Sequence, residues 1–378
     1  MRRCAAAAIG ATARRTFSTP AAFPAVDATV GGAPRLEAAR AAPRAASRAL
    51  LLGTVCYSES TASIWKGIMR HFARRGLEVE TVLFSSYERM NAALLSRSIH
   101  IAWNGPLSHA RVLRLAPPGS VLALGMRDSD RDFTTHCIVR RDAGIDSPAS
   151  LAHRRVALGT VDSPQAYLAP LASLQAAGFP LHTLTITRYD RDVGKHGDTA
   201  HGETGVLEAL ASGAAEAGYV SDLMWQRALA KTPALGEALA VCPALAVAPF
   251  DHCQFTALAG KLSLPRAKAF QDALLAMGDG TGHAEDAQTL ALEGVRERWL
   301  PSRGGALQPA RRGREEGAAT GAAALLPDAT AGYAAMLQAL EAFGEPVVRW
   351  PGHLHTPRRH PFKHLIIDSS LVRDSFGC

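Results

Sequence analysis

The sequence predicts an α/β protein organised in two units, and three features of the chain support this. Between residues 50 and 115, short apolar runs alternate with amphipathic stretches, which is typical of parallel strands joined by helices. A second series of strands and helices begins near Gly144. Residues 152–222 contain two turns in which a strand leads into a helix, and a parallel sheet collects its ligand-binding groups at such turns.

The first unit is expected to contain three strands, at residues 50–56, 77–83 and 99–103. Each is followed by a helical pattern, and Ser58 or Ser60 is the expected N-cap of the first helix. Ser85 and Glu88 have the spacing of a capping box at the start of the second helix. Pro106 occupies the first position of the third helix, where its missing N–H costs nothing.

Further strands are expected at residues 121–126, 134–139 and 156–158. After the last of them, Ser163 stands as N-cap before Pro164 at the first helical position. A helix that begins there leaves unpaired N–H groups at the positive end of its dipole, which suits an anion. The next turn predicts a strand at residues 219–220 and a new helix start at Ser221.

The remainder of the chain carries weaker signals. Residues 240–258 are expected to be extended, and residues 263–277 form a clear helical pattern. Residues 278–327, rich in glycine, alanine and charge, are expected to be partly loose, and helical spacing returns at residues 332–343. The tail of residues 346–378 has no predicted fold and carries four histidines, His353, His355, His360 and His364.

The first 48 residues are predicted to be a transit peptide and a disordered linker. No acid occurs before Asp27, and arginine, alanine and hydroxyl residues dominate, as in organelle targeting sequences. We therefore expect import into mitochondria, with export by the twin-arginine pathway as the alternative, since Arg14 and Arg15 fit its core. No run of about eighteen apolar residues occurs, so no transmembrane segment is predicted.

Charge and cysteine content exclude some classes of protein. The formal net charge is +7, but eight arginines against two acids lie in the first 48 residues, so the rest is nearly neutral. This balance gives no reason to expect a nucleic-acid partner. Six cysteines in 378 residues are no disulfide framework, and an intracellular destination would keep them reduced.

Several phrases, taken in order, resemble the phosphate and phosphonate substrate-binding proteins of ABC transporters. They include Ser-Tyr-Glu at residues 86–88, Ile-Ala-Trp-Asn-Gly-Pro at 101–106, Arg-Arg-Val-Ala-Leu-Gly at 154–159 and Gly-Val-Leu-Glu-Ala-Leu-Ala-Ser-Gly at 205–213. The resemblance spans residues 50–260. It implies a two-lobed type II periplasmic-binding-protein fold with two crossover hinge strands and the ligand between the lobes.

The resemblance also implies a division of the chain and a set of ligand-binding residues. Residues 49–138 and 250–345 would form lobe 1, and residues 139–249 lobe 2. The implied ligand-binding residues are Ser58, Tyr87, Ser163, His201, Glu203 and Asp222. Glu203 stands where the family has an oxyanion-binding histidine, and an unpaired carboxylate repels a dianion. The ligand is therefore expected to be small and anionic or zwitterionic, phosphonate- or phosphate-like, without a fixed identity.

Five further residues are candidate metal ligands because each begins or ends an expected strand beside the hinge: Cys56, His136, Cys137, His252 and Cys253. A cluster of thiolates and imidazoles can hold zinc, copper or iron. The alternative is that small reduced cysteines pack in strands, which is their commonest role. The main expectation is a protein without a cofactor.

We favour a non-catalytic binding protein, since no nucleophile elbow, Walker A motif or dinucleotide-binding glycine pattern occurs. The mitochondrial address argues against an ABC transporter as its partner. The alternative is an enzyme on the same scaffold, because thiamine-pyrimidine synthases resemble this fold and use pyridoxal phosphate and iron. Lys195, His201, His252 and Cys253 are the candidates for that chemistry, although the cysteine-cluster motif of those enzymes is absent. The polar run at residues 195–203 is either an ordinary loop or a ligand loop facing the cleft.

Overall fold

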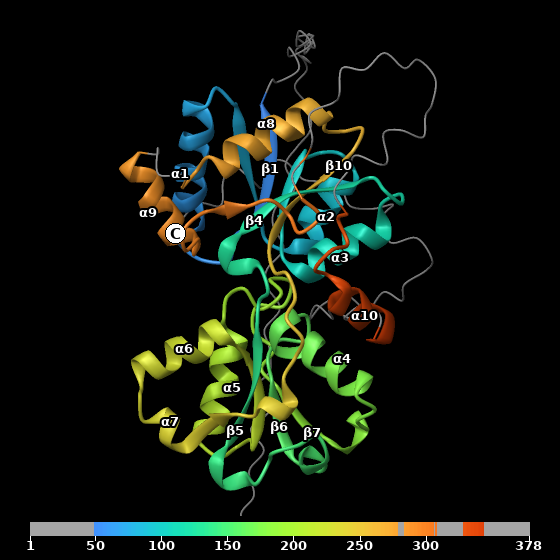
Figure 1. The fold of residues 1–378 in the computed structure, drawn as a ribbon, viewed down its shortest axis with the longest axis vertical. Helices are drawn as coiled ribbons and strands as arrows, with labels where there is room; N and C mark the ends of the chain where they lie inside the picture. The colour runs from blue at the N-terminus through green and yellow to red at the C-terminus, as the bar shows by residue number, and fades with distance from the viewer. Residues whose placement is uncertain (1–48, 279–282, 306, 308–327, 344–378) are drawn as a thin grey trace, which may run out of the picture. The chain divides into compact units, whose positions relative to one another are not determined.

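The computed structural model describes residues 49–278, 283–305, 307 and 328–343. These residues form two mixed sheets, with helices on both faces of each (Figure 1). The strand order is β11-β4-β10-β3-β1-β2 in the first sheet and β7-β6-β8-β5-β9 in the second. The predicted targeting sequence and the histidine-bearing tail lie outside the described residues. None of the described helices is both long and apolar enough to cross a bilayer.

The first sheet consists of β1 (Leu50–Val55), β2 (Val79–Phe84), β3 (Ile101–Asn104), β4 (Val121–Arg127), β10 (Gln254–Leu258) and β11 (Trp299–Leu300). β1 pairs in parallel with β2 and β3, as the sequence predicts, whereas β10 runs antiparallel to β3 and β4. The apolar runs of β1 and β3 are buried because helices cover both faces. Those helices are α1 (Thr61–Arg74), α2 (Tyr87–Leu95), α3 (Pro106–Leu115) and α8 (Leu264–Leu275).

The second sheet consists of β5 (Thr135–Arg140), β6 (Arg155–Leu158), β7 (Thr185–Arg188), β8 (Ala217–Ser221) and β9 (Leu239–Val241). Figure 1 shows α4 (Ala169–Ala176) on one side of this sheet, and α5 (His201–Ala211) and α6 (Asp222–Lys231) on the other. A short helix, α7 (Leu235–Ala238), precedes β9. The two cores on either face are separate clusters of buried side chains.

The predicted helix starts in the second unit are confirmed. Ser163 caps a π-helical turn, Pro164–Leu168, that continues into α4, and its Oγ accepts a hydrogen bond from the backbone N–H of Ala166. Ser221 caps α6, with Oγ accepting from the backbone N–H of Met224. Each serine caps the N-terminus of its own helix, which is the commonest role of a serine at this position.

The capping box predicted for α2 was wrong by one residue. Ser86, not Ser85, is the N-cap, and its Oγ accepts from the backbone N–H of Arg89. Glu88 does not turn back to the cap. Its carboxylate instead forms an ion pair with Arg111, an interaction between residues far apart in the sequence that outweighs the local pattern.

Two segments differ from the sequence prediction. The stretch expected to be partly loose contains α9 (Ala284–Glu293), a regular helix that ends at Gly294 in the left-handed conformation. Strand β5 pairs with β8 and β9, so residues 135–138, assigned to lobe 1, lie in the second sheet. The physical reason is register: the main-chain groups of β5 pair with β8 over five successive residues.

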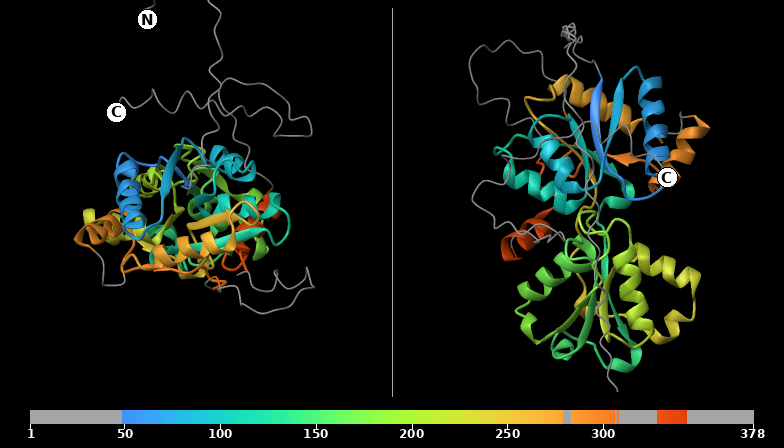
Figure 2. Two further views of the ribbon diagram at one scale, coloured as in Figure 1. Left: turned by 90° about the horizontal axis from the view of Figure 1, so that it is seen from above. Right: turned by 180° about the vertical axis from the view of Figure 1, so that it is seen from behind.

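Within the described residues, three segments of chain pass between the two sheets, and the third of them is residues 328–333. The first joins β4 to β5 and contains a 3-10 turn, Asp128–Asp130; the second joins β9 to β10. The third leads into α10 (Ala334–Phe343), which packs against α4 and α3 and contributes Met336, Ala339 and Leu340 to a core on the second sheet. Figure 2 shows α10 beside α4 from behind as well. Residues 334–343, assigned to lobe 1, thus contact both units.

Candidate functional site

A cavity of about 590 Å³ lies where residues from both sheets meet, at the two segments that join β4 to β5 and β9 to β10. The cavity, called the cleft below, has walls of mixed polar and apolar character. Its volume is within the range of small-molecule sites in proteins. The cleft is therefore the candidate functional site.

Arg127 organises one wall of the cleft. It ends β4, and its guanidinium donates two hydrogen bonds to the Asp130 carboxylate, at 2.5 and 2.7 Å. The same group lies 5.4 Å from the centre of the Trp103 ring, within cation–π distance. Burial alone would raise the pKa of Asp130, but the Arg127 guanidinium holds it at about 2. Arg127 and Asp130 are thus a charged pair at neutral pH.

Glu293 extends this network from the end of α9. Its Oε2 accepts a hydrogen bond of 2.9 Å from the Tyr57 hydroxyl, while its Oε1 lies 3.6 Å from the Arg127 guanidinium and has no hydrogen-bond partner among the described residues. The side chain is 3% exposed. Burial raises the pKa of Glu293 to about 7, and the nearby Arg127 only partly opposes this. Glu293 therefore changes charge near neutral pH.

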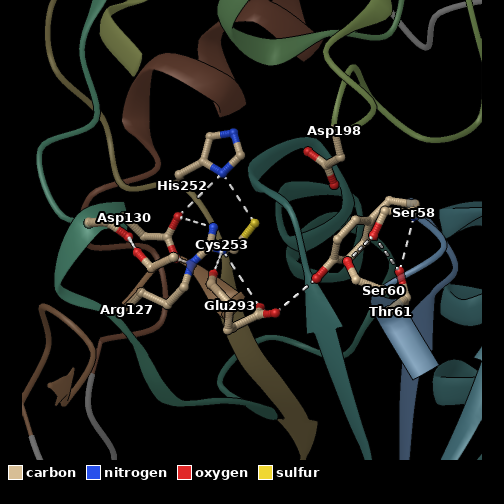
Figure 3. Close-up of polar contacts among 12 residues, drawn as sticks. Ser58, Ser60, Thr61, Arg127, Asp130, Asp198, His252, Cys253 and Glu293 are labelled. Atoms are coloured by element: carbon tan, nitrogen blue, oxygen red, sulfur yellow. Dashed lines mark hydrogen bonds and ion pairs between the residues drawn. The ribbon is translucent and has the colours of Figure 1, made fainter. Parts of the chain in front are cut away.

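His252 and Cys253 lie beside this pair, just before β10 begins. Nδ1 of His252 lies 3.1 Å from Sγ of Cys253 and 3.5 Å from Oδ1 of Asp130, so it is turned toward both (Figure 3). Burial raises the pKa of the Cys253 thiol well above its ordinary value, so the thiol is protonated. Nε2 of His252 is buried and lacks a hydrogen-bond partner among the described residues.

These three side chains, Asp130, His252 and Cys253, are the donors within the described residues that lie close enough together to hold one metal ion. All three are buried and face the cleft. A zinc site needs donors at about 2.0–2.3 Å from one point, and the distances between these donors approach that geometry. However, Arg127 already occupies both oxygens of Asp130 and places a positive charge beside the cluster.

Glu203 lies on the opposite wall, in the first turn of α5. Its Oε2 accepts hydrogen bonds from the backbone N–H of Ser221, at 2.5 Å, and from the Ser221 hydroxyl, at 2.7 Å. Its Oε1 accepts from Nε2 of Gln165 at 3.0 Å. The side chain is 3% exposed, and burial raises its pKa against these hydrogen bonds.

Asp198 enters the cleft from the loop before α5. One of its oxygens accepts a hydrogen bond from the Tyr87 hydroxyl of α2. Burial raises the pKa of Asp198, and the imidazole of His252 partly counteracts the shift. The loop around Asp198 thus brings a further carboxyl group to a cleft that already contains Glu203 and Glu293.

Of the six predicted ligand-binding residues, Glu203 and Asp222 line the cleft. Asp222 accepts a hydrogen bond of 2.9 Å from Nε2 of His136. The other four do not line it. Ser58 is exposed and hydrogen-bonded to its neighbours, and Tyr87 is buried behind Asp198.

Ser163 and His201 are also outside the cleft. Ser163 is 1% exposed and lies beneath Gly197, where an added Cβ would come within 2.6 Å of the serine Oγ. The loop of Gly197 therefore covers the helix start that the sequence predicts as an anion site. His201 is exposed at the N-terminus of α5 and forms an ion pair of 2.7 Å with Asp192.

The five predicted metal ligands do not gather in one place. His252 and Cys253 lie together, but Cys56 is exposed and Cys137 is buried against Tyr219 of β8. The physical reason is the strand period, because successive side chains of a strand point to opposite faces. His136 and Cys137 are neighbours within β5, so one faces Asp222 and the other the core.

Several polar residues that line the cleft were not predicted as site residues from the sequence: Tyr57, Arg127, Asp130, Gln165 and Glu293. Arg127 and Asp130 follow a predicted strand directly, so their position at a strand end was the available signal. No sequence signal pointed to Glu293, because its helix was not predicted. Asp198 belongs to the polar run considered as a ligand loop, and this residue of the run does line the cleft.

Comparison with protein families gives one match. The family model described as the periplasmic substrate-binding protein of phosphonate ABC transporters matches residues 56–298, more than half of the chain. A search of curated proteins found no match.

Two solved proteins have similar folds. PhnD1 from Prochlorococcus marinus, in complex with methylphosphonate, has a TM-score of 0.51 and 16% identity, covering 68% of this chain and 93% of that chain. XAC2383 from Xanthomonas citri, bound to ATP, has a TM-score of 0.52 and 18% identity, covering 68% of this chain and 91% of that chain. At such identities the likeness concerns the fold alone. It confirms the predicted two-lobed type II architecture.

Proposed function

Because this chain belongs to the periplasmic substrate-binding proteins of phosphonate ABC transporters, we propose that it captures a small zwitterionic solute in the cleft and delivers it to a membrane transporter. The family supports an oxyanion as one part of the solute. The distribution of charge in the cleft is the observation that supports a zwitterionic solute. Asp198, Glu203 and Glu293 are carboxylates of the cleft wall, whereas the arginines Arg227 and Arg296 lie exposed at the same cavity.

A simple dianion is a poor match for such a cleft. Glu203 and Glu293 are buried and Asp198 is half-buried, and they share the cleft with the half-buried Arg127 guanidinium, whose charge Asp130 already balances. Bringing two further negative charges into a partly desolvated cavity is opposed by Coulomb repulsion, which is strong where water is excluded. A solute with an ammonium group replaces that repulsion with attraction.

The prediction of mitochondrial import was wrong. The family to which the chain belongs is described as periplasmic, and periplasmic proteins are exported. The objection to a transporter partner rested on the mitochondrial address and falls with it.

The enzyme alternative has less support than the binding protein. Of its four candidate residues, His252 and Cys253 line the cleft, whereas Lys195 and His201 do not. A Schiff-base lysine must reach its cofactor within the same cavity as the other reacting groups. The family match favours a binding protein for the same reason, since it concerns substrate capture.

Isothermal titration calorimetry with three matched probes tests the proposal. 2-Aminoethylphosphonate carries both charges, ethylphosphonate lacks the amine and ethanolamine lacks the phosphonate. We expect the zwitterion to bind at least about tenfold more tightly than either single-charge probe, which corresponds to about 1.4 kcal/mol. Ethylphosphonate binding as tightly as the zwitterion, or no heat from any of the three, would overturn the proposal.

A further inference from the structure

The donor groups on the second-sheet wall of the cleft are already used inside the protein. They are the backbone N–H of Ser221, the Ser221 hydroxyl and the side-chain amide of Gln165. All three donate to the Glu203 carboxylate, at 2.5 to 3.0 Å. Ser221 is also the N-cap of α6, so the carboxylate lies at the positive end of a ten-residue helix.

This arrangement is the one expected for a bound oxyanion. Main-chain and hydroxyl donors at a helix N-terminus form a ready-made anion site. Here the anion belongs to the chain itself. A phosphonate or phosphate oxygen approaching Ser221 would have to displace Glu203, whose side chain is 3% exposed.

Four buried side-chain atoms of cleft residues lack a hydrogen-bond partner within the described residues: Nε of Arg131, Nε2 of His252 and two acceptor oxygens. Oε1 of Gln165 and Oε1 of Glu293 are buried and receive no hydrogen bond within the described part of the chain. Both side chains are at least nine-tenths buried. Leaving such atoms unsatisfied costs free energy, so the best ligand for them brings hydrogen-bond donors.

The charged groups of the cleft also differ between its interior and its exposed part. Glu293 and Asp198 lie toward the interior, beside Arg127 and Tyr87 respectively. Arg227 and Arg296 have exposed side chains at the same cavity, as do Asp132 and Asp222, and neither arginine forms an ion pair within the described part of the chain. A zwitterion therefore meets acceptors inside and cations outside.

We propose that Glu203 is a built-in substitute for the oxyanion of the ligand, so that the solute binds with its ammonium group toward Glu293 and Asp198 and its anionic group toward Arg227 and Arg296. This inference rests on the proposed function for the site, and it fixes the orientation of the solute. It also makes Glu203 the residue that excludes simple oxyanions.

The test is a gain of function in Glu203→Ala, with methylphosphonate as the probe in isothermal titration calorimetry. Removing the carboxylate frees the Ser221 N–H, the Ser221 hydroxyl and the Gln165 amide. Hydrogen bonds to a charged group are stronger than those between neutral groups, so methylphosphonate affinity should rise at least about tenfold over that of the unmodified chain. Adding Ser221→Ala to the variant should remove most of the gain.

The matched control is Glu208→Ala, which removes an exposed carboxylate from the same helix. It should leave methylphosphonate binding unchanged. Glu203→Gln keeps the volume of the side chain and removes its charge, so it serves as the second variant if Glu203→Ala does not fold by circular dichroism. A folded Glu203 variant that binds methylphosphonate no better than the unmodified chain would overturn the inference.

The orientation has its own measurement. Glu293→Gln should weaken 2-aminoethylphosphonate binding at least about tenfold at pH 8 while leaving ethylphosphonate binding unchanged. An equal loss of affinity for both probes would contradict a solute bound with its ammonium group toward Glu293. The gain in Glu203→Ala does not require the unmodified chain to bind any probe, so failure of the proposed function and failure of this inference give different results.

Discussion

The Tyr87 ring of α2 lies flat against the His196 ring, with ring centroids 4.4 Å apart and an angle of 12° between the planes. Tyr87 follows the first-sheet strand β2, and His196 belongs to the loop between the second-sheet strand β7 and α5. The backbone N–H of Tyr87 also donates to the carbonyl of Gly194, at 3.0 Å. Tyr87 therefore fixes the loop that carries Asp198 into the cleft, although it does not line the cleft itself.

Tyr87→Phe should loosen this loop without removing the ring stacking. The Asp198 carboxylate loses its hydroxyl donor, and the free energy of unfolding should fall by about 1–3 kcal/mol. Urea denaturation measures the change. Tyr167→Phe is the control, because its hydroxyl makes no hydrogen bond within the described part of the chain, and it should change stability far less. An equal effect of the two substitutions would contradict the role of Tyr87.

Glu293 predicts a pH dependence of stability. In the unfolded chain its pKa is near the ordinary value of 4.5, whereas burial raises it to about 7 in the folded protein. Between these values the folded state holds one proton more than the unfolded state, so the free energy of unfolding falls as the pH rises. Glu293→Gln should remove about 3 kcal/mol of this fall between pH 5 and pH 8.

Urea denaturation at both pH values checks this prediction. Glu297→Gln is the control, since Glu297 is exposed and close in sequence. Its pH profile should run parallel to that of the unmodified chain. If the Glu293→Gln profile is parallel as well, another group controls stability in this range.

Ser163→Ala should affect stability and leave binding unchanged. The substitution removes an N-cap acceptor, which costs about 1 kcal/mol. Because Ser163 lies beneath Gly197 and outside the cleft, 2-aminoethylphosphonate affinity should not change. Calorimetry and urea denaturation of the same variant give both values. A clear loss of affinity in a folded variant would return Ser163 to the binding site.

Protein purified without chelator is expected to contain far less than one equivalent of zinc, copper or iron. Arg127 holds both oxygens of Asp130, which leaves His252 and Cys253 as free donors, and two donors bind a metal ion weakly. Elemental analysis by mass spectrometry measures the content. One equivalent of metal, lost in Cys253→Ser, would establish the metal site that the sequence suggested as an alternative.

The sequence predicted local structure well where local chemistry decides it. Ser163 and Ser221 cap their helices as expected, because the serine and the amide it accepts from are three residues apart. The sequence predicted side-chain contacts poorly where a residue far along the chain competes with a local partner. Glu88 forms its ion pair with Arg111, and no pattern around residue 85 contains that partner.

The same distinction explains the outcome at the cleft. Glu203 and Asp222 were implied by the family resemblance, and each lies in the first turn of its helix. The pairing of Arg127 with Asp130 is local, but its meeting with Glu293 depends on how α9 packs, more than 160 residues later. Successive side chains of a strand point to opposite faces, so His136 and Cys137 of β5 point apart. This rule could have been used to separate the two residues from the sequence alone.

The position of α10 makes the opening of the two lobes sensitive to temperature. Met336, Ala339 and Leu340 are buried where α10 meets α4 and α3, so rotation of one unit against the other exposes part of this apolar surface. Hydrophobic contacts of this kind weaken on cooling. Closure of the lobes on a solute would therefore gain less free energy from this contact in the cold than in warm water.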